Sequence, residues 1–224
     1  IQGTGFFDSS DKIIKLLVAL LTSLATVVMP RVANSFINGD NEQIERLLRK
    51  SFDYISFLSI PLMFGLAAVS KSFSIWFFGQ DFAPVGQVLL IQSMVIPIIA
   101  WASITGNQYL LPTNHNKEYT ISVIAGAVVN LILNIPLIIK FGVFGAAVST
   151  IIAELVVTAI QVYYVGKEFS VRLLFKGSWR YWAAGIPMFI IVYFLDARLP
   201  ISLINLVIEV SLGIIIYFGL LVVD

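Results

Sequence analysis

The sequence contains no cysteine and a single histidine, His115, in 224 residues. Without cysteine, the chain cannot form a disulfide bond, a thiolate metal site or a cysteine nucleophile. One histidine is too few for a metal-binding cluster or a proton relay. The net charge of +1 excludes the broad basic field that is typical of nucleic-acid-binding proteins. We therefore expect no metal, no cofactor, no catalytic residue and no nucleic-acid partner.

Charged residues are also scarce. They make up 12% of the chain, against about 25% in soluble domains, whereas 58% of the residues are hydrophobic. Long runs with no charge, or with one at most, recur at residues 16–30, 54–70, 82–116, 119–139, 141–166, 181–195 and 199–223. One membrane crossing needs about 20 apolar helical residues. The sequence therefore predicts an all-α polytopic membrane protein with about seven transmembrane helices.

The organisation of the chain follows from these runs. The apolar runs begin soon after Ile1, without a basic leader, which indicates an internal fragment of a larger membrane protein. The basic and aromatic segment 167–180 separates five runs from the last two. We predict a five-helix bundle in residues 1–166, an interfacial connection at 167–180 and a terminal pair of transmembrane helices in 181–224.

The basic residues predict how the chain is oriented. Residues 31–51, 112–118 and 167–180 hold nine of the 14 Lys and Arg residues. Since such residues are retained on the cytoplasmic side, we expect the N-terminal end outside and the C-terminal end in the cytoplasm. Within the first of these segments, Asp40 and Gln43 have capping-box spacing. Residues 40–50 are expected to form a short amphipathic helix along the membrane surface.

Small and polar residues interrupt two neighbouring runs at helical spacing. They form two faces, one of Gly126, Asn130 and Asn134 and the other of Gly145, Ser149 and Ala153. One interpretation is that the two faces pack together, with asparagine side chains bonding across the helices. The other is that the asparagines line a polar cavity.

Two acids, Glu154 and Glu209, lie inside the predicted spans. An acid near the centre of a span costs at least about 2.5 kcal/mol on insertion scales, so its presence suggests a function. Glu154 either accepts a proton and couples transport to an ion gradient, or meets a polar partner such as Asn130 or Gln161. Asp196, at the end of a run, is expected to be a surface turn residue.

A charged cluster precedes the first run. Asp8 and Lys12, and likewise Asp11 and Lys15, are four residues apart, which favours ion pairs on a helix. Such surface pairs contribute little to stability. Alternatively, Lys12 and Lys15 lie at the mouth of an apolar helix, where they could attract an anionic head group.

Two stretches carry a resemblance to a family. Residues 5–36, GFFDSSDKIIKLLVALLTSLATVVMPRVANSF, resemble the oligosaccharide-flippase helix that starts with Gly-aromatic-aromatic, continues with a basic residue and closes with proline. Residues 130–154, NLILNIPLIIKFGVFGAAVSTIIAE, resemble a second hallmark, N-x-x-L-N followed by a turn and F-G-x-x-G-A-A-x-S-T. Over nearly its whole length, the chain resembles the polysaccharide-exporter branch of the multidrug/oligosaccharidyl-lipid/polysaccharide flippase superfamily.

The resemblance implies a fold of two six-helix lobes that are often followed by two further helices. This chain would then be most of the C-terminal lobe with the terminal pair, and its partner would be the missing N-terminal lobe. The implied function is to flip polyprenyl-pyrophosphate-linked oligosaccharides, such as O-antigen, capsular or exopolysaccharide repeat units, across the bacterial cytoplasmic membrane by alternating access. Membrane lipid, polysaccharide polymerases and glycosyltransferases would be further partners.

The resemblance also implies site residues. A related flippase has an arginine at the position of Lys12, next to an acid like Asp11, so Lys12, Asp11 and Lys15 are the predicted substrate-binding residues. The predicted coupling or cavity residues are Glu154, Asn130 and Asn134. Two alternatives remain open. A multidrug/toxin cation antiporter would line its cavity with more carboxylates, and a membrane enzyme acting on lipid-linked sugars would need a catalytic loop outside the membrane.

Overall fold

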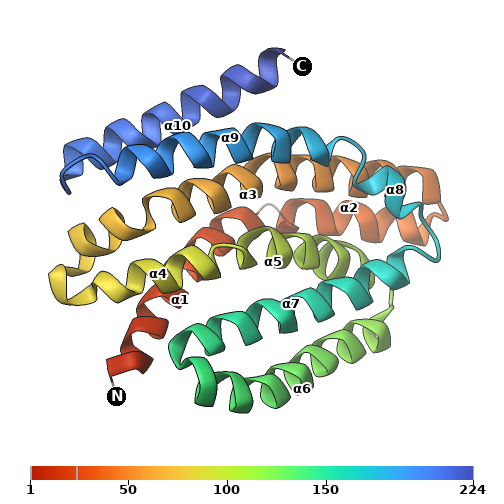
Figure 1. The fold of residues 1–224 in the computed structure, drawn as a ribbon. Coiled ribbons are helices and arrows are strands. Elements are labelled where there is room, and N and C mark those ends of the chain that lie inside the picture. Colours follow the sequence, from red (N-terminus) through yellow and green to blue (C-terminus); the bar gives the residue numbers. More distant parts are fainter. Residues whose placement is uncertain (1, 24, 224) are drawn as a thin grey trace.

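The computed structural model describes residues 2–23 and 25–223, whose regular elements are all helical (Figure 1). In chain order they are α1 (Gln2–Thr22), α2 (Ala25–Ile37), α3 (Asn41–Phe78), the 3₁₀ turn η1 (Gln80–Phe82), α4 (Ala83–Gln92), α5 (Val95–Ser103), the π-helix η2 (Ile104–Leu110), α6 (Asn116–Phe141), α7 (Val143–Val165), α8 (Val171–Leu174), α9 (Ser178–Asp196) and α10 (Leu203–Val223). The predicted all-α class is confirmed.

Four helices, α3, α6, α7 and α10, are long and apolar enough to cross a membrane. Two bent pairs raise the number to six if each counts as one span: α1 with α2, and η1–α4 with α5–η2, each bent by 48°. Six of the seven predicted runs coincide with these candidates. The seventh forms α9, where Arg180 and two tryptophans lower the apolar character of the helix.

Helix α3 is longer than a membrane crossing requires. Its 38 residues span about 57 Å at 1.5 Å per residue, against a hydrocarbon core of about 30 Å. The Asp40 carboxylate caps the helix by accepting a hydrogen bond from the Gln43 backbone N–H at 2.9 Å, as predicted. The predicted separate surface helix at residues 40–50 is wrong. Buried Ile44, Leu48 and Phe52 continue one packed face, so the helix runs on without a break.

Helices α6 and α7 form a tight antiparallel hairpin. Gly142, with a φ of +59°, is the single residue between them. A Cβ on Gly145 would lie 2.0 Å from the Leu137 carbonyl oxygen, so the two backbones touch there. The Ser149 hydroxyl donates to Asn134 Oδ1 across the hairpin. The predicted packing of the two small-residue faces is confirmed.

The helices form a layered bundle (Figure 1). Helices α9 and α10 lie along one side of α3, and the α6–α7 hairpin lies on the opposite side of the bundle. Ala184, Met188 and Val192 of α9 pack with Ala68 and Val69 of α3 in an apolar cluster. The three segments predicted to be cytoplasmic, residues 31–51, 112–118 and 167–180, lie at the same end of the bundle. The division of the chain into a bundle, a connection and a terminal pair stays a prediction.

Candidate functional site

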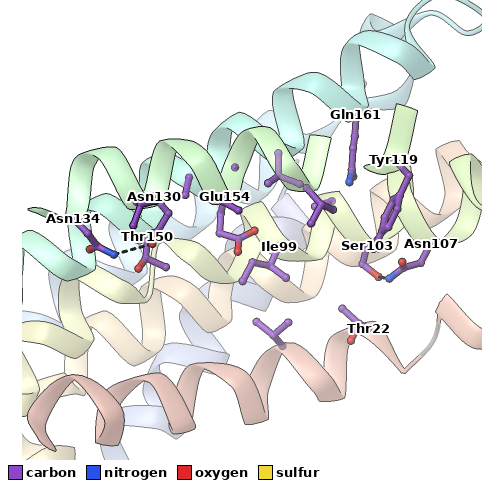
Figure 2. A pocket seen from close by; sticks show the side chains of 18 residues that line it. Thr22, Ile99, Ser103, Asn107, Tyr119, Asn130, Asn134, Thr150, Glu154 and Gln161 are labelled. Atoms are coloured by element: carbon purple, nitrogen blue, oxygen red, sulfur yellow. Dashed lines mark hydrogen bonds between the residues drawn. The ribbon is translucent and has the colours of Figure 1, made fainter. Parts of the chain in front are cut away.

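A cavity of about 800 Å³ opens between α1, α5, η2, α6 and α7 (Figure 2). Its lining is mixed: apolar side chains alternate with amides, hydroxyls and one acid, among them Ser103, Asn107, Asn130, Thr150, Glu154 and Gln161. A second cavity of about 580 Å³ adjoins it beside α1 and α4, and both cavities are lined by Asn130, Thr150 and Glu154. Together they form one polar hollow on the side of α7 that faces α1.

Glu154 is the acid of this hollow. It projects from α7 into the cavity and is half-buried (Figure 2). Its carboxyl group makes no hydrogen bond or ion pair with any residue that the structure describes. Asn130 bonds to Asn134, and Gln161 bonds to Thr105 and Ser122. The interpretation in which Glu154 meets Asn130 or Gln161 is therefore wrong, while its role in coupling stays a prediction.

The two asparagines of α6 serve both roles that the sequence left open. Asn134 Nδ2 donates to Asn130 Oδ1 at 2.8 Å, and Asn134 Oδ1 accepts from Ser149 of α7. Both asparagines also line the cavity. Because their polar groups are already oriented by these bonds, the amides present a fixed hydrogen-bonding edge to whatever enters.

A buried network fixes the π-helix η2 against this hollow. The Thr105 hydroxyl donates to Gln161 Oε1 at 2.7 Å, and Gln161 Nε2 donates to the Ser122 hydroxyl at 3.0 Å. A Cβ on Gly106 would lie 2.8 Å from the Tyr119 ring, so η2 packs closely on α6. π-helical turns often occur at functional sites, and here Asn107 of η2 lines the cavity. Sequence reasoning missed this segment, although its polar run SITGNQ within an uncharged stretch was a usable signal.

The charged cluster of α1 reaches the second cavity in part. Lys15 Nζ pairs with Asp11 Oδ2 at 2.6 Å, as predicted, and both residues line that cavity. The Asp11 side chain is 24% exposed and the Lys15 side chain 75% exposed. Buried Ser10 donates to Gln92 Oε1, which anchors α1 on α4 next to this pair.

Lys12 is exposed and lines neither cavity. The predicted pair between Asp8 and Lys12 is absent from the ion pairs formed by the residues that the structure describes. That prediction is wrong because the Lys12 ammonium remains free on the surface of α1. The assignment of Lys12, Asp11 and Lys15 to substrate stays a prediction.

Comparison with known proteins identifies the family. A family model described as "Lipid II flippase MurJ" matches residues 4–220. The chain belongs to the MurJ lipid II flippase family. This places it in the flippase superfamily that its motifs indicated, and the relatives are named as flippases and not as enzymes.

Curated relatives within this superfamily cover much of the chain. The "Probable low-salt glycan biosynthesis flippase Agl15" of Haloferax volcanii is 25% identical over 218 residues, which are 97% of this chain and 45% of the relative. A candidate O-antigen transporter of Escherichia coli (strain K12) is 27% identical over 165 residues, covering 72% of this chain and 39% of the relative. The chain therefore spans less than half the length of these relatives.

A solved structure shows the same fold. The lipid II flippase MurJ in an inward closed conformation superposes with a TM-score of 0.78 at 21% identity. The match covers 97% of this chain and 46% of the solved chain. The helical arrangement of Figure 1 is thus the arrangement of one part of a MurJ-type fold.

Proposed function

We propose that this chain is the C-terminal lobe, with the terminal helix pair, of a flippase that moves polyprenyl-pyrophosphate-linked oligosaccharide between membrane leaflets by alternating access. The observation that carries the proposal is the cavity of Figure 2, whose polar lining holds a single acid, Glu154, within a MurJ-family fold. Relatives named for glycan biosynthesis and for O-antigen transport support an oligosaccharide repeat unit as the substrate class.

The chemistry of the hollow suits such a substrate. Sugars present many hydroxyl groups, and amides such as Asn107 and Asn130 can donate and accept hydrogen bonds at once. A pyrophosphate needs cations instead, and Lys15 stands at the edge of the same hollow. Its pair with Asp11 is exposed, and such pairs contribute only about 0.2–1 kcal/mol. Lys15 can therefore exchange the Asp11 carboxylate for a phosphate oxygen at small cost.

Lys12 would be a second cation for the pyrophosphate. It lies one residue from Asp11 on the exposed surface of α1, where the N-terminal lobe of a complete flippase would face it. A lysine offers a compact point charge and not the planar fork of an arginine. We propose that Lys12 and Lys15 together neutralise the pyrophosphate while the polyprenyl tail stays in lipid.

We further propose that Glu154 couples flipping to an ion gradient. Its carboxyl group stands in the hollow without a partner, so it can take up a proton or a cation when the cavity opens to one side. The proposed orientation has the N-terminal end of the chain outside and the C-terminal end in the cytoplasm of a bacterial cell. The gathering of basic segments at one end of the bundle supports it.

The test uses the full-length protein that contains this chain, reconstituted in vesicles with a fluorescent lipid-linked oligosaccharide. Lys12→Ala and Lys15→Ala should each slow flipping at least about tenfold, because each removes a cation from a pyrophosphate site. Lys140→Ala, at the exposed turn between α6 and α7, is the matched control and should leave the rate unchanged.

Two results would contradict the proposal. Normal flipping by both lysine variants would reject these residues as the pyrophosphate site. Absence of flipping by wild type, together with organic-cation efflux that Glu154→Gln abolishes, would favour the cation antiporter. That alternative draws support from the single unpaired acid in the hollow.

A further inference from the structure

The terminal helices α9 and α10, which lie on the other side of the bundle from the α6–α7 hairpin, carry two buried acids. Asp196, the last residue of α9, is 7% exposed, and Glu209 of α10 is 2% exposed. The expectation that Asp196 is a surface turn residue is therefore wrong. The chain reverses after α9, and α10 packs back along α9.

The surroundings of the two carboxyl groups differ. The Glu209 carboxyl interacts with that of Asp196. Asp196 also lies beside Ser72 and Lys71 of α3. One oxygen of each acid, Asp196 Oδ1 and Glu209 Oε2, is buried with no hydrogen-bond partner among the described residues. If both groups were carboxylates, these two buried oxygens would have no hydrogen-bond donor.

A small cavity beside the pair separates it from the central hollow. It measures about 390 Å³ and lies between α3, α4 and α9, where Lys71, Gln87, Tyr193 and Asp196 line it. Lys71 and Asp196 are the charged side chains of this lining, and α4 contributes the neutral Gln87. The cavity thus reaches Asp196 near the end of α3, with Lys71 and Gln87 among a mostly apolar lining.

Two neighbouring carboxylates with so little exposure repel each other and lose their hydration, so one of them must be neutralised. A metal ion is a poor candidate, because no group of three or more acids or histidines occurs among the described residues and Lys71 already brings a positive charge. A proton fits better, since a carboxylic acid can donate to a carboxylate and so give a buried oxygen the partner it lacks.

We propose that Asp196 and Glu209 share a single proton, carried by Glu209 and donated to the charged Asp196, and that this proton site holds α9 and α10 against the end of α3. Asp196 is the member of the pair that keeps the charge in this proposal, because the Lys71 ammonium lines the same cavity and favours a carboxylate there. Loss of the proton leaves two adjacent buried charges, which loosens the terminal pair. The site is independent of the proposed substrate and of Glu154.

The proposed proton site predicts how the stability of the protein depends on pH. At neutral pH the folded protein holds a proton that an unfolded chain, with a free glutamate, has already released. Stability therefore falls as the pH rises until the proton leaves the folded state as well. Titration from about pH 5 to about pH 8 should lower the melting temperature of wild type, and Glu209→Gln should remove at least about half of that drop because its amide keeps a donor without a titrating proton.

The experiment uses the full-length protein in detergent, with Asp81→Asn as the matched control, since Asp81 is an exposed acid at the same end of the bundle. Infrared spectra should show the carbonyl band of a buried carboxylic acid in wild type and in the control. That band should weaken as the pH of wild type is raised, a readout that needs no variant to fold. In a Glu154→Gln background, which removes the half-buried acid of the hollow, the band should remain, and adding Glu209→Gln should abolish it.

Three results would overturn the proposal. The acid band could persist when Glu209→Gln is added to Glu154→Gln, the melting curves of wild type and Glu209→Gln could respond identically to pH, or no acid band could be found in Glu154→Gln. Stabilisation of wild type by sodium or calcium at constant pH, lost in Glu209→Gln, would also overturn it in favour of a bound cation.

Discussion

Gly145 stands where α6 and α7 approach most closely, which makes it a quantitative test of the hairpin that carries Asn130, Asn134 and Glu154. A Cβ built on Gly145 lies 2.0 Å from the carbonyl oxygen and 2.3 Å from the carbonyl carbon of Leu137. Ordinary contact begins at 3.4 Å, so Gly145→Ala must push the two helices apart by about 1.4 Å. The obstructing atoms belong to the backbone of α6, and rotation of a side chain cannot relieve the clash.

The expected cost combines two effects. Overpacking in a well-packed interior costs about 1–3 kcal/mol. A separation of this size also strains the bond from Ser149 to Asn134, which is worth about 0.5–1.5 kcal/mol. Gly145→Ala should therefore destabilise the protein by about 2–4 kcal/mol. A loss of 1 kcal/mol in stability lowers the melting temperature by about 2–4 °C in a chain of 150–250 residues, and by less in a longer one. The melting temperature should therefore fall by several degrees.

The assay is the melting temperature of the full-length protein in detergent, with two glycine variants for comparison. Gly65→Ala in α3 meets nothing within 4 Å and should be neutral or gain up to about 1 kcal/mol from helix propensity. Gly126→Ala clashes with a movable side-chain atom, Val157 Cγ2 at 2.3 Å, and should fall between the other two. Equal melting temperatures for Gly145→Ala and Gly65→Ala would refute the packing of the hairpin described above.

Two further predictions concern the hollow. Gln161→Leu removes two buried hydrogen bonds, to Thr105 and Ser122, and should lower the free energy of unfolding by about 1–3 kcal/mol in a denaturation assay. The same change at exposed Gln80 is the control and should cost nothing measurable. Equal costs would show that the network does not hold η2. Glu154→Gln should retain binding of lipid-linked oligosaccharide but make flipping in vesicles independent of proton or sodium gradients, and a persistent gradient dependence would remove Glu154 from coupling.

Much of this molecule could be predicted from local chemistry. The all-α membrane fold follows from composition, because a chain so poor in charge and so rich in apolar runs must satisfy its backbone within helices. The cap at Asp40 and the contact between α6 and α7 follow from the spacing of a few residues. The motifs within residues 5–36 and 130–154 indicated the superfamily. Caps, helix contacts and motifs of this kind are properties of short stretches of chain, so the sequence shows them.

What lay beyond the sequence depends on residues brought together from distant helices. Asp196 is at a helix end, like any surface residue, until α10 folds back over it. The sequence suggested Gln161 as a partner of Glu154. In the structure Gln161 instead accepts a hydrogen bond from Thr105, which lies 56 positions before it in the chain. Helix periodicity and capping depend on residues within a few helical turns, so they can be predicted from the sequence. Burial and pairing depend on which helices meet, and the packing of the whole bundle sets that.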